Sequence, residues 1–457
     1  MRRTNLIKSI TPGSEKGYQF VLYSDSCSGV KGTVEEKAFK KMNSVIKELD
    51  PLPQFILFPG DEIIGLTPKE EELLHQWEYW KNIEMAWFHE NNIPIYNTTG
   101  NHTAYDEVSE RVFKKCNAHL PENGPQNQKK LSYYTVKDEL LLVFINTLCH
   151  DKGGEGHVEL EWLEKVLSDH KELKYKFVVG HHPVHQVGTM ISDYELTIHS
   201  KNGIDVWDIF KKHKVFAYLC GHILDYDVQI HDGILQIVSG GAGRSRRYLH
   251  LIQAAVDERG LRYQVLNVNK KQDHWFEWPL KLPDSKDWIL LHNAENEAPL
   301  LTIQKKNQKY IIIWDIKAEI NSSLCSTMQT MISGWNSEND LFAFWIGIIG
   351  SEQQVTVQIR PENNRSPGFW HGPKIDPGEK IELQIAMHSG MGPGGILWRS
   401  NESGNWTSFR TANNWGVEKV SWPKKWTVGY DRNTIKVFPF KIGTLAVKYY
   451  LQAVNPE

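Results

Sequence analysis

Five short polar clusters in the first half of the chain each follow an apolar run and carry side chains that bind metals or transfer protons. They are, in chain order, Asp25-Ser26-Cys27, Gly60-Asp61-Glu62, Gly100-Asn101-His102, Gly180-His181-His182-Pro183 and Gly221-His222. Mixed carboxylate, amide and imidazole ligands favour manganese, iron or zinc over calcium or a thiolate cluster. Two such ions that share one carboxylate can hold a phosphate and activate a water between them, and Asp61 is the natural shared ligand.

The elements that must position these clusters alternate between strand and helix. Apolar runs predict strands at residues 19–23, 55–58, 93–96, 133–136, 140–146, 177–180 and 216–219. Amphipathic runs predict helices at residues 34–49, 69–90, 105–120, 159–169 and 204–212. This alternation predicts an α/β domain. Because the carboxyl ends of strands form the ligand crevice in such sheets, we expect the five clusters at one edge.

The pattern changes near residues 279–283, where helical periodicity ends. Short apolar or alternating strands are expected at residues 310–316, 341–348, 354–360, 380–387, 426–429 and 444–450. Turn signals such as Asp376-Pro377-Gly378 separate them, and this spacing predicts a β-sandwich. The sequence therefore divides into an α/β domain at residues 1–278 and an all-β domain at residues 284–457.

Composition excludes several classes of protein. The formal charge of −3 argues against a nucleic-acid coat or a polybasic membrane surface. No apolar run approaches a membrane span in length. The N-terminal segment has two arginines but no apolar core after them, so it is a poor signal peptide and we expect a cytoplasmic location. The five cysteines show no CxxC spacing, which argues against a disulfide framework or a zinc ribbon.

The order of the five clusters resembles the calcineurin-like metallophosphoesterase family, whose pattern reads Asp-x-His, Gly-Asp, Gly-Asn-His, His-x-Pro and Gly-His-x-His. The segments VELEWLEKVL (158–167) and ILQIVSGGAG (234–243) also resemble a helix and a strand of that family. The resemblance extends over residues 18–270. It implies an αββα sandwich of two mixed sheets, one or two divalent ions (Mn, Fe or Zn), and hydrolysis of a phosphomonoester or phosphodiester by a metal-activated water.

Carried over by position, the family pattern implies a role for each matching residue. It gives one metal a complete ligand set: Asp61, Asn101, His181 and His222. It makes Asp25 a ligand of the other metal, with Asp61 bridging. His102 is then the catalytic histidine, which contacts the phosphate and assists the leaving group.

Three positions depart from the family pattern. Cys27 and Leu224 replace expected ligands, and Thr103 replaces the acid that commonly follows Gly-Asn-His. Two of the four ligands of one metal are therefore missing. Cys27 either binds as a thiolate or fills space as a small buried residue, while Asp225 or Asp227 can swing in as a ligand. The alternative to a hydrolase is thus a degenerate, non-catalytic binding or scaffold protein with an incomplete first metal site.

Two further segments carry weaker signals. Arg244 and the arginines after it can clamp a phosphate or lie on the solvated surface. Residues 426–452 resemble the closing strands of concanavalin-like jelly rolls, which implies a carbohydrate or protein partner for the C-terminal domain, although a purely structural sandwich is the alternative. Six tryptophans either stack on sugars or fill the core: Trp335, Trp345, Trp370, Trp398, Trp406 and Trp415.

Overall fold

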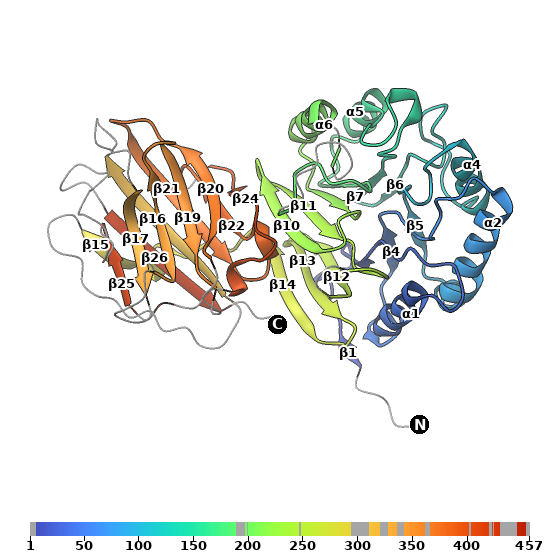
Figure 1. Cartoon of the computed structure of the whole chain (residues 1–457), viewed down its shortest axis with the longest axis horizontal. Helices are drawn as coiled ribbons and strands as arrows, with labels where there is room; N and C mark the ends of the chain where they lie inside the picture. The colour runs from blue at the N-terminus through green and yellow to red at the C-terminus, as the bar shows by residue number, and fades with distance from the viewer. Residues whose placement is uncertain are drawn as a thin grey trace.

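The computed structural model describes residues 6–188, 197–198, 200–245, 248–293, 310–319, 328–335, 342–361, 366–401, 404–419, 423, 425–429 and 446–453. The chain forms an α/β part followed by an all-β part, and the two lie side by side (Figure 1). Within these ranges no helix is both long and apolar enough to span a membrane.

Two mixed six-stranded sheets form the centre of the α/β part. One sheet has the order β14 (Gln272–Trp278), β13 (Gly260–Asn267), β12 (His250–Asp257), β2 (Tyr18–Leu22), β4 (Phe55–Phe58) and β5 (Ile95–Asn97). The other has the order β10 (Tyr226–His231), β11 (Ile234–Ser239), β9 (Ala217–Cys220), β8 (Tyr175–Val179), β7 (Leu140–Phe144) and β6 (Tyr133–Lys137). Strands β2, β4 and β5 are parallel neighbours, as are β7, β8 and β9. Parallel strands are covered on both faces, which explains their nearly continuous apolar runs.

Helices cover the outer face of each sheet (Figure 1). The first sheet packs with α1 (Val34–Ile46), α2 (Glu70–Tyr79), α3 (Ala86–Glu90) and α4 (Glu107–Cys116). The second packs with α5 (Leu160–Asp169) and α6 (Ser200–Lys212). Between the sheets, the rings of Phe20 on β2 and Phe177 on β8 meet edge to face at 6.1 Å. The predicted αββα sandwich is confirmed. The helix predicted for residues 34–49 ends earlier, because β3 (Leu49–Asp50) follows α1 and pairs in parallel with β1 (Ile7–Lys8).

The prediction of one continuous helix over residues 69–90 was wrong, because the segment divides into α2, a π-helical turn and α3. Between α2 and α3 the chain forms a π-helix, η1 (Trp80–Glu84), and the Met85 N–H donates to the Trp80 carbonyl at 2.9 Å. The wider turn brings Trp80 and Glu84 onto one face, toward the first polar cluster. Trp80 Nε1 donates to Ser26 Oγ at 3.2 Å. Glu84 Oε2 accepts from Ser28 Oγ at 2.9 Å and from the Gly29 N–H at 3.0 Å. The irregular turn therefore anchors the loop that carries Asp25 and Cys27.

The C-terminal part consists of two antiparallel six-stranded sheets, as predicted for a sandwich. One has the order β15 (Ile289–Asn293), β26 (Ala446–Ala453), β16 (Tyr310–Glu319), β21 (Lys380–His388), β22 (Ile396–Arg399) and β23 (Thr407–Ser408). The other has the order β24 (Arg410–Thr411), β20 (Gly368–Lys374), β19 (Gln354–Ile359), β18 (Phe344–Ile349), β17 (Met328–Trp335) and β25 (Lys425–Val428). The last strand of the first part ends at Trp278, and the exact division at 278 and 284 stays a prediction.

Most of the six tryptophans considered for sugar stacking fill the interior of the C-terminal part. Four are buried: Trp335, Trp345, Trp370 and Trp406. Trp398 and Trp415 are half-buried and pack against the sandwich core. The core therefore accounts for these side chains, and none of them indicates a sugar site. Most of the segment that resembles jelly-roll strands, residues 430–445, lies outside the described residues.

Candidate metal centre

The five polar clusters meet where five strands end. Asp25 follows β2, Asp61 follows β4, and Asn101 and His102 follow β5. His181 follows β8 and His222 follows β9 in the facing sheet. Backbone hydrogen bonds tie the first two loops together: the Asp25 N–H donates to the Gly60 carbonyl at 3.2 Å, and the Cys27 N–H to the Asp61 carbonyl at 2.8 Å. The two sheets thus contribute to one site.

Four donor atoms from the predicted complete ligand set converge on one point. His181 Nε2 lies 3.0 Å from Asn101 Oδ1, 3.1 Å from His222 Nδ1 and 3.3 Å from Asp61 Oδ2. His222 Nδ1 lies 3.0 Å from Asn101 Oδ1. Tetrahedral ligands about 2 Å from a zinc-like ion stand roughly 3.3 Å apart. The four atoms therefore have nearly the mutual spacing of a coordination sphere.

The electrostatics of these atoms call for a positive charge at their centre. His181 Nδ1 lies 2.8 Å from the Pro59 carbonyl, which only accepts, so Nδ1 carries a proton and Nε2 is the ring nitrogen that faces the other donors. Burial by itself lowers the pKa of His181, but the Asp61 carboxylate outweighs burial and raises it to about 9. A proton is thus favoured where a cation would sit, and the donor set fits a divalent metal.

The backbone adopts the left-handed region at four residues of the centre. The φ angles are 62° at Asp25, 41° at Cys27, 58° at Asp61 and 63° at His222. For residues with a Cβ this conformation costs about 1–3 kcal/mol each and persists only where the surroundings enforce it. Glycine neighbours make the crowding possible, since a Cβ at Gly100 would overlap the Asp61 carboxylate. The strain turns the site residues toward one another.

Asp25 is buried with one carboxylate oxygen unsatisfied. Its side chain is 1% exposed. Oδ2 accepts from Ser24 Oγ and, at 3.0 Å, from the His222 N–H. Oδ1 has no hydrogen-bond partner among the described residues. Burial and the nearby Asp61 carboxylate raise the pKa of Asp25 to about 6. A buried carboxylate oxygen without a partner is costly, and a cation would satisfy it.

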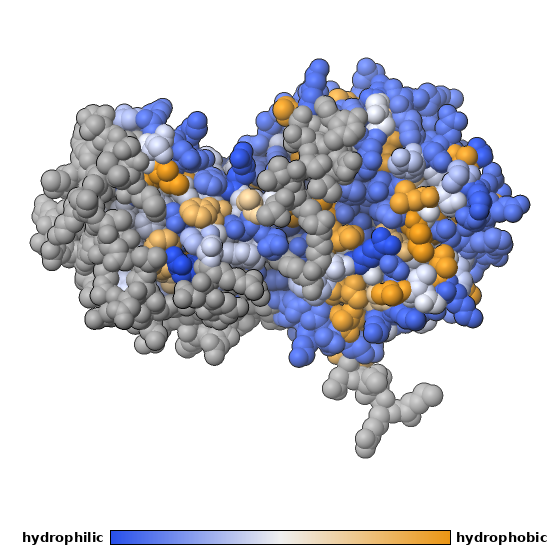
Figure 2. Space-filling view, viewed as in Figure 1, coloured by the Kyte–Doolittle hydropathy of each residue, from blue (hydrophilic) through white to orange (hydrophobic). Residues whose placement is uncertain are grey.

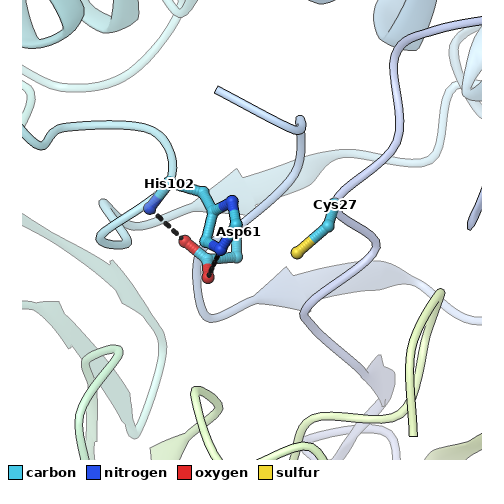
Figure 3. A group of neighbouring side chains, drawn as sticks. All are labelled: Cys27, Asp61 and His102. Atoms are coloured by element: carbon cyan, nitrogen blue, oxygen red, sulfur yellow. Dashed lines mark hydrogen bonds and ion pairs between the residues drawn. The ribbon is translucent and has the colours of Figure 1, made fainter. Parts of the chain in front are cut away.

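The departures from the family pattern have distinct surroundings. The thiol of Cys27 points toward Asp61, and the Cys27, Asp61 and His102 donor atoms all lie within 4.8 Å of one another (Figure 3). Asp227 does not act as a replacement ligand, because its carboxylate has other partners. Oδ1 accepts from the Gly394 N–H at 3.0 Å, and Oδ2 accepts from Gln229 at 2.7 Å. The Thr103 hydroxyl accepts from the Gly100 N–H at 2.9 Å and so closes the turn that holds Asn101 and His102.

His102 lies at the accessible side of the centre. Its backbone N–H donates to Asp61 Oδ1 at 2.9 Å (Figure 3). Its Nδ1 lies 2.6 Å from the Ile64 carbonyl and therefore carries a proton, which leaves Nε2 free to act on a ligand of the site. Nε2 is 4.0 Å from Asp61 Oδ2, farther than the donors of the complete set are from one another. This placement suits a phosphate contact rather than a ligand of the complete position.

Sequence reasoning missed Glu155. Its Oε1 lies 3.0 Å from Nε2 of the buried His182, whose Nδ1 lies 2.8 Å from the Thr147 hydroxyl. The rings of His182 and His222 are 4.3 Å apart. Burial raises the pKa of Glu155. The sequence signal for this residue was an acid among glycines, in the run Gly153-Gly154-Glu155-Gly156. In the structure the three glycines have positive φ.

Arg244 lies next to the first loop but has a partner of its own. Its Nε donates to Glu35 Oε1 at 3.0 Å, and its side chain is 40% exposed. The Gly243 N–H donates to the Asp25 carbonyl at 3.1 Å, which holds Arg244 near the centre. Substrate binding by Arg244 stays a prediction, and Arg246 and Arg247 lie outside the described residues.

The comparison with protein families agrees with the fold of the α/β part. Residues 19–226, which lie in the α/β part, match the family model for calcineurin-like phosphoesterases. This match supports phosphoester hydrolysis and the use of a divalent metal at the level of the family. No curated protein sequence matches the chain.

Solved structures similar to parts of the chain are distant. A purple acid phosphatase from yellow lupin (Lupinus luteus) is 15% identical over 59% of this chain and 55% of its own, with a TM-score of 0.44. This chain thus covers about half of the lupin enzyme. A dimetal phosphatase from Danio rerio is 12% identical over 55% of this chain and 96% of its own, with a TM-score of 0.39. A carbohydrate-binding module of a Ruminococcus gnavus sialidase is 13% identical over 35% of this chain and 93% of its own, with a TM-score of 0.24.

Proposed function

We propose that the protein is a metal-dependent phosphoester hydrolase whose activity depends on Asp61 and His102. The observation that carries the proposal is the convergence of four donor atoms from Asp61, Asn101, His181 and His222 with separations of 3.0–3.3 Å. A divalent cation held there supplies a Lewis acid that polarises the phosphoryl group and lowers the pKa of water.

Asp61 and His102 have separate roles around that position. Asp61 presents Oδ2 to His181 Nε2 and Oδ1 to the His102 N–H, so it couples the cation position to the catalytic histidine. His102 presents Nε2 to the ligand side of the centre. When the ring also carries a proton at Nε2, as well as the one at Nδ1, it can pass the Nε2 proton to the leaving oxygen. Both phosphomonoesters and phosphodiesters release such an oxygen, so both are candidate substrates.

Hydrolysis of bis(p-nitrophenyl) phosphate and p-nitrophenyl phosphate by protein loaded with manganese, iron(II) or zinc tests the proposal. We expect turnover that Asp61→Ala and His102→Ala abolish or reduce strongly. The exposed His75→Ala variant is the matched histidine control and retains activity. Turnover in the Asp61→Ala and His102→Ala variants that equals that of the wild type would exclude the proposed site.

The replacements at Cys27 and Leu224 favour a second candidate function, a binding or scaffold protein that keeps the fold and one ion. It predicts one tightly held ion and no turnover of either ester with any of the three metals. A cytoplasmic location and a carbohydrate or protein partner of the C-terminal domain stay predictions.

A further inference from the structure

The second cation position of this fold has lost two nitrogen ligands, yet its surroundings still present unsatisfied donors. Asp25 Oδ1 is buried without a hydrogen-bond partner. Cys27 is 1% exposed, and no hydrogen bond engages its sulfur among the described residues. The Cys27 sulfur lies within 4.8 Å of donor atoms of Asp61 and His102. A buried thiol beside a carboxylate, with a second buried carboxylate oxygen, two residues away, that has no partner in the described part of the chain, is not explained by packing alone.

The loop geometry directs the Cys27 side chain into the centre rather than into the core. The Cys27 N–H donates to the Asp61 carbonyl at 2.8 Å, and the positive φ of 41° turns the side chain out of line with its neighbours. On one side Trp80 holds Ser26, and on the other Glu84 holds Ser28, through the hydrogen bonds of η1. The sulfur therefore lies toward the Asp61 carboxylate (Figure 3).

We propose that Cys27 and Asp61, with Asp25 on the same loop as Cys27, form a rebuilt cation position with one sulfur ligand, which makes it selective for zinc-like, thiophilic ions over manganese or magnesium. Thiolate ligands select soft or borderline ions, whereas carboxylates alone do not. The inference deepens the proposed function and rests on it for the neighbouring cation at His181 and His222.

Binding at this position exchanges a proton for the ion. The thiol S–H bond breaks, an S–metal bond forms, and the proton passes to solvent, so no oxidant or further reactant is needed. His102 Nε2 lies 4.0 Å from Asp61 Oδ2, and a ring nitrogen of His102 lies within 4.8 Å of the Cys27 sulfur, so His102 borders the same position.

Cadmium titration of the full-length protein, stripped of metals beforehand, tests the inference without turnover. The readouts are the ultraviolet thiolate-to-cadmium absorption band and the number of cadmium ions bound per chain. We expect the band and two ions in the wild type, and no band with one ion in Cys27→Ser. Cys149→Ser, which changes another buried cysteine, is the matched control and keeps both.

Each other outcome overturns the inference. Bound ions without the absorption band in the wild type would mean that Cys27 is not a ligand, while a one-ion hydrolase would still stand. A band that persists in Cys27→Ser would assign the sulfur to another cysteine. If no ion binds and neither ester is hydrolysed, the proposed function fails as well. Circular dichroism of Cys27→Ser confirms that the variant is folded in every case.

Discussion

At the scale of single residues, two of the site histidines, His181 and His102, are each oriented by a partner on the far side of the ring. His181 Nδ1 donates to the Pro59 carbonyl at 2.8 Å, and His102 Nδ1 donates to the Ile64 carbonyl at 2.6 Å. Both carbonyls belong to the segment around Asp61, so one loop sets the tautomer of both rings. The two histidines nevertheless face different atoms, and this difference separates their roles.

Substitution of the two histidines is predicted to separate metal binding from catalysis. His181→Ala removes one of four converging donors, so we expect loss of the tightly bound ion and of hydrolysis together. His102→Ala leaves those donors in place, so we expect unchanged metal content and a fall in kcat of about 10²- to 10⁴-fold. Elemental analysis beside steady-state kinetics checks both. Equal metal loss in both variants would contradict the division of roles.

Glu155 places a carboxylate beside the complete donor set, and this charge should influence substrate choice. Its repulsion of a phosphomonoester dianion exceeds that of a diester monoanion. We expect Glu155→Gln to raise the monoester to diester ratio of kcat/KM about fivefold, which corresponds to about 1 kcal/mol. Glu159→Gln is the matched control, because Glu159 already pairs with Lys152 at 2.8 Å. A ratio that changes equally in both variants would exclude a local effect of Glu155.

At the scale of elements, the π-helix η1 links the helical layer to the centre. Glu84 is buried on this element, and its Oε1 has no hydrogen-bond partner among the described residues. Burial raises the pKa of Glu84 to about 7. The folded protein therefore keeps the Glu84 proton at a pH where the unfolded chain, with an ordinary pKa near 4.3, has released it.

The sign of this shift gives a prediction for stability against pH. Between about pH 4.5 and 7 the folded state binds more protons at Glu84 than the unfolded state does. The contribution of Glu84 to the free energy of unfolding therefore falls as the pH rises. Glu84→Gln removes this titration and can still accept from Ser28 and Gly29. Between pH 5 and pH 8, we expect the free energy of unfolding to fall by about 2 kcal/mol less in the variant than in the wild type. Urea unfolding at both values measures the difference, and parallel pH profiles would contradict it.

Much of the fold and part of the centre could be predicted from sequence for a common physical reason. Buried parallel strands are short apolar runs, and each run here ends in a glycine or small residue beside a polar one, as at Gly60-Asp61 and Gly221-His222. The π-helix was missed because its residues keep an apolar pattern that a plain α-helix also satisfies. Glu155 was missed because its approach to His182 depends on a loop fold that no periodicity encodes. The engagement of Asp227 by Gly394 depends on contact between distant parts of the chain.

At the scale of the whole molecule, the two parts share a hydrophobic core. The cluster that fills the α/β part also includes Ile311, Ile313, Ala386, Met391, Leu397 and Trp406 of the C-terminal part. Hydrogen bonds cross the same boundary, from the Val228 N–H to the Met391 carbonyl at 3.1 Å and from the Ile230 N–H to Ser408 Oγ at 2.9 Å. The outline narrows where the parts meet, and hydrophilic residues are frequent on the face in view (Figure 2). Because separation of the two parts would expose this shared cluster, we expect them to unfold together rather than independently.

A substitution in the C-terminal part should therefore destabilise the helices of the N-terminal part. Met391 is fully buried in the shared cluster, and truncation of a buried methionine costs about 2–5 kcal/mol. Circular dichroism at 222 nm reports α-helices, and those of the described chain all precede His213. We expect Met391→Ala to lower the midpoint of that signal by several degrees. Phe369→Ala, which truncates a side chain that is 40% exposed in the same part, is the control and leaves the midpoint unchanged. If Met391→Ala shifts only the tryptophan fluorescence and not the helix signal, the two parts unfold independently despite their shared core.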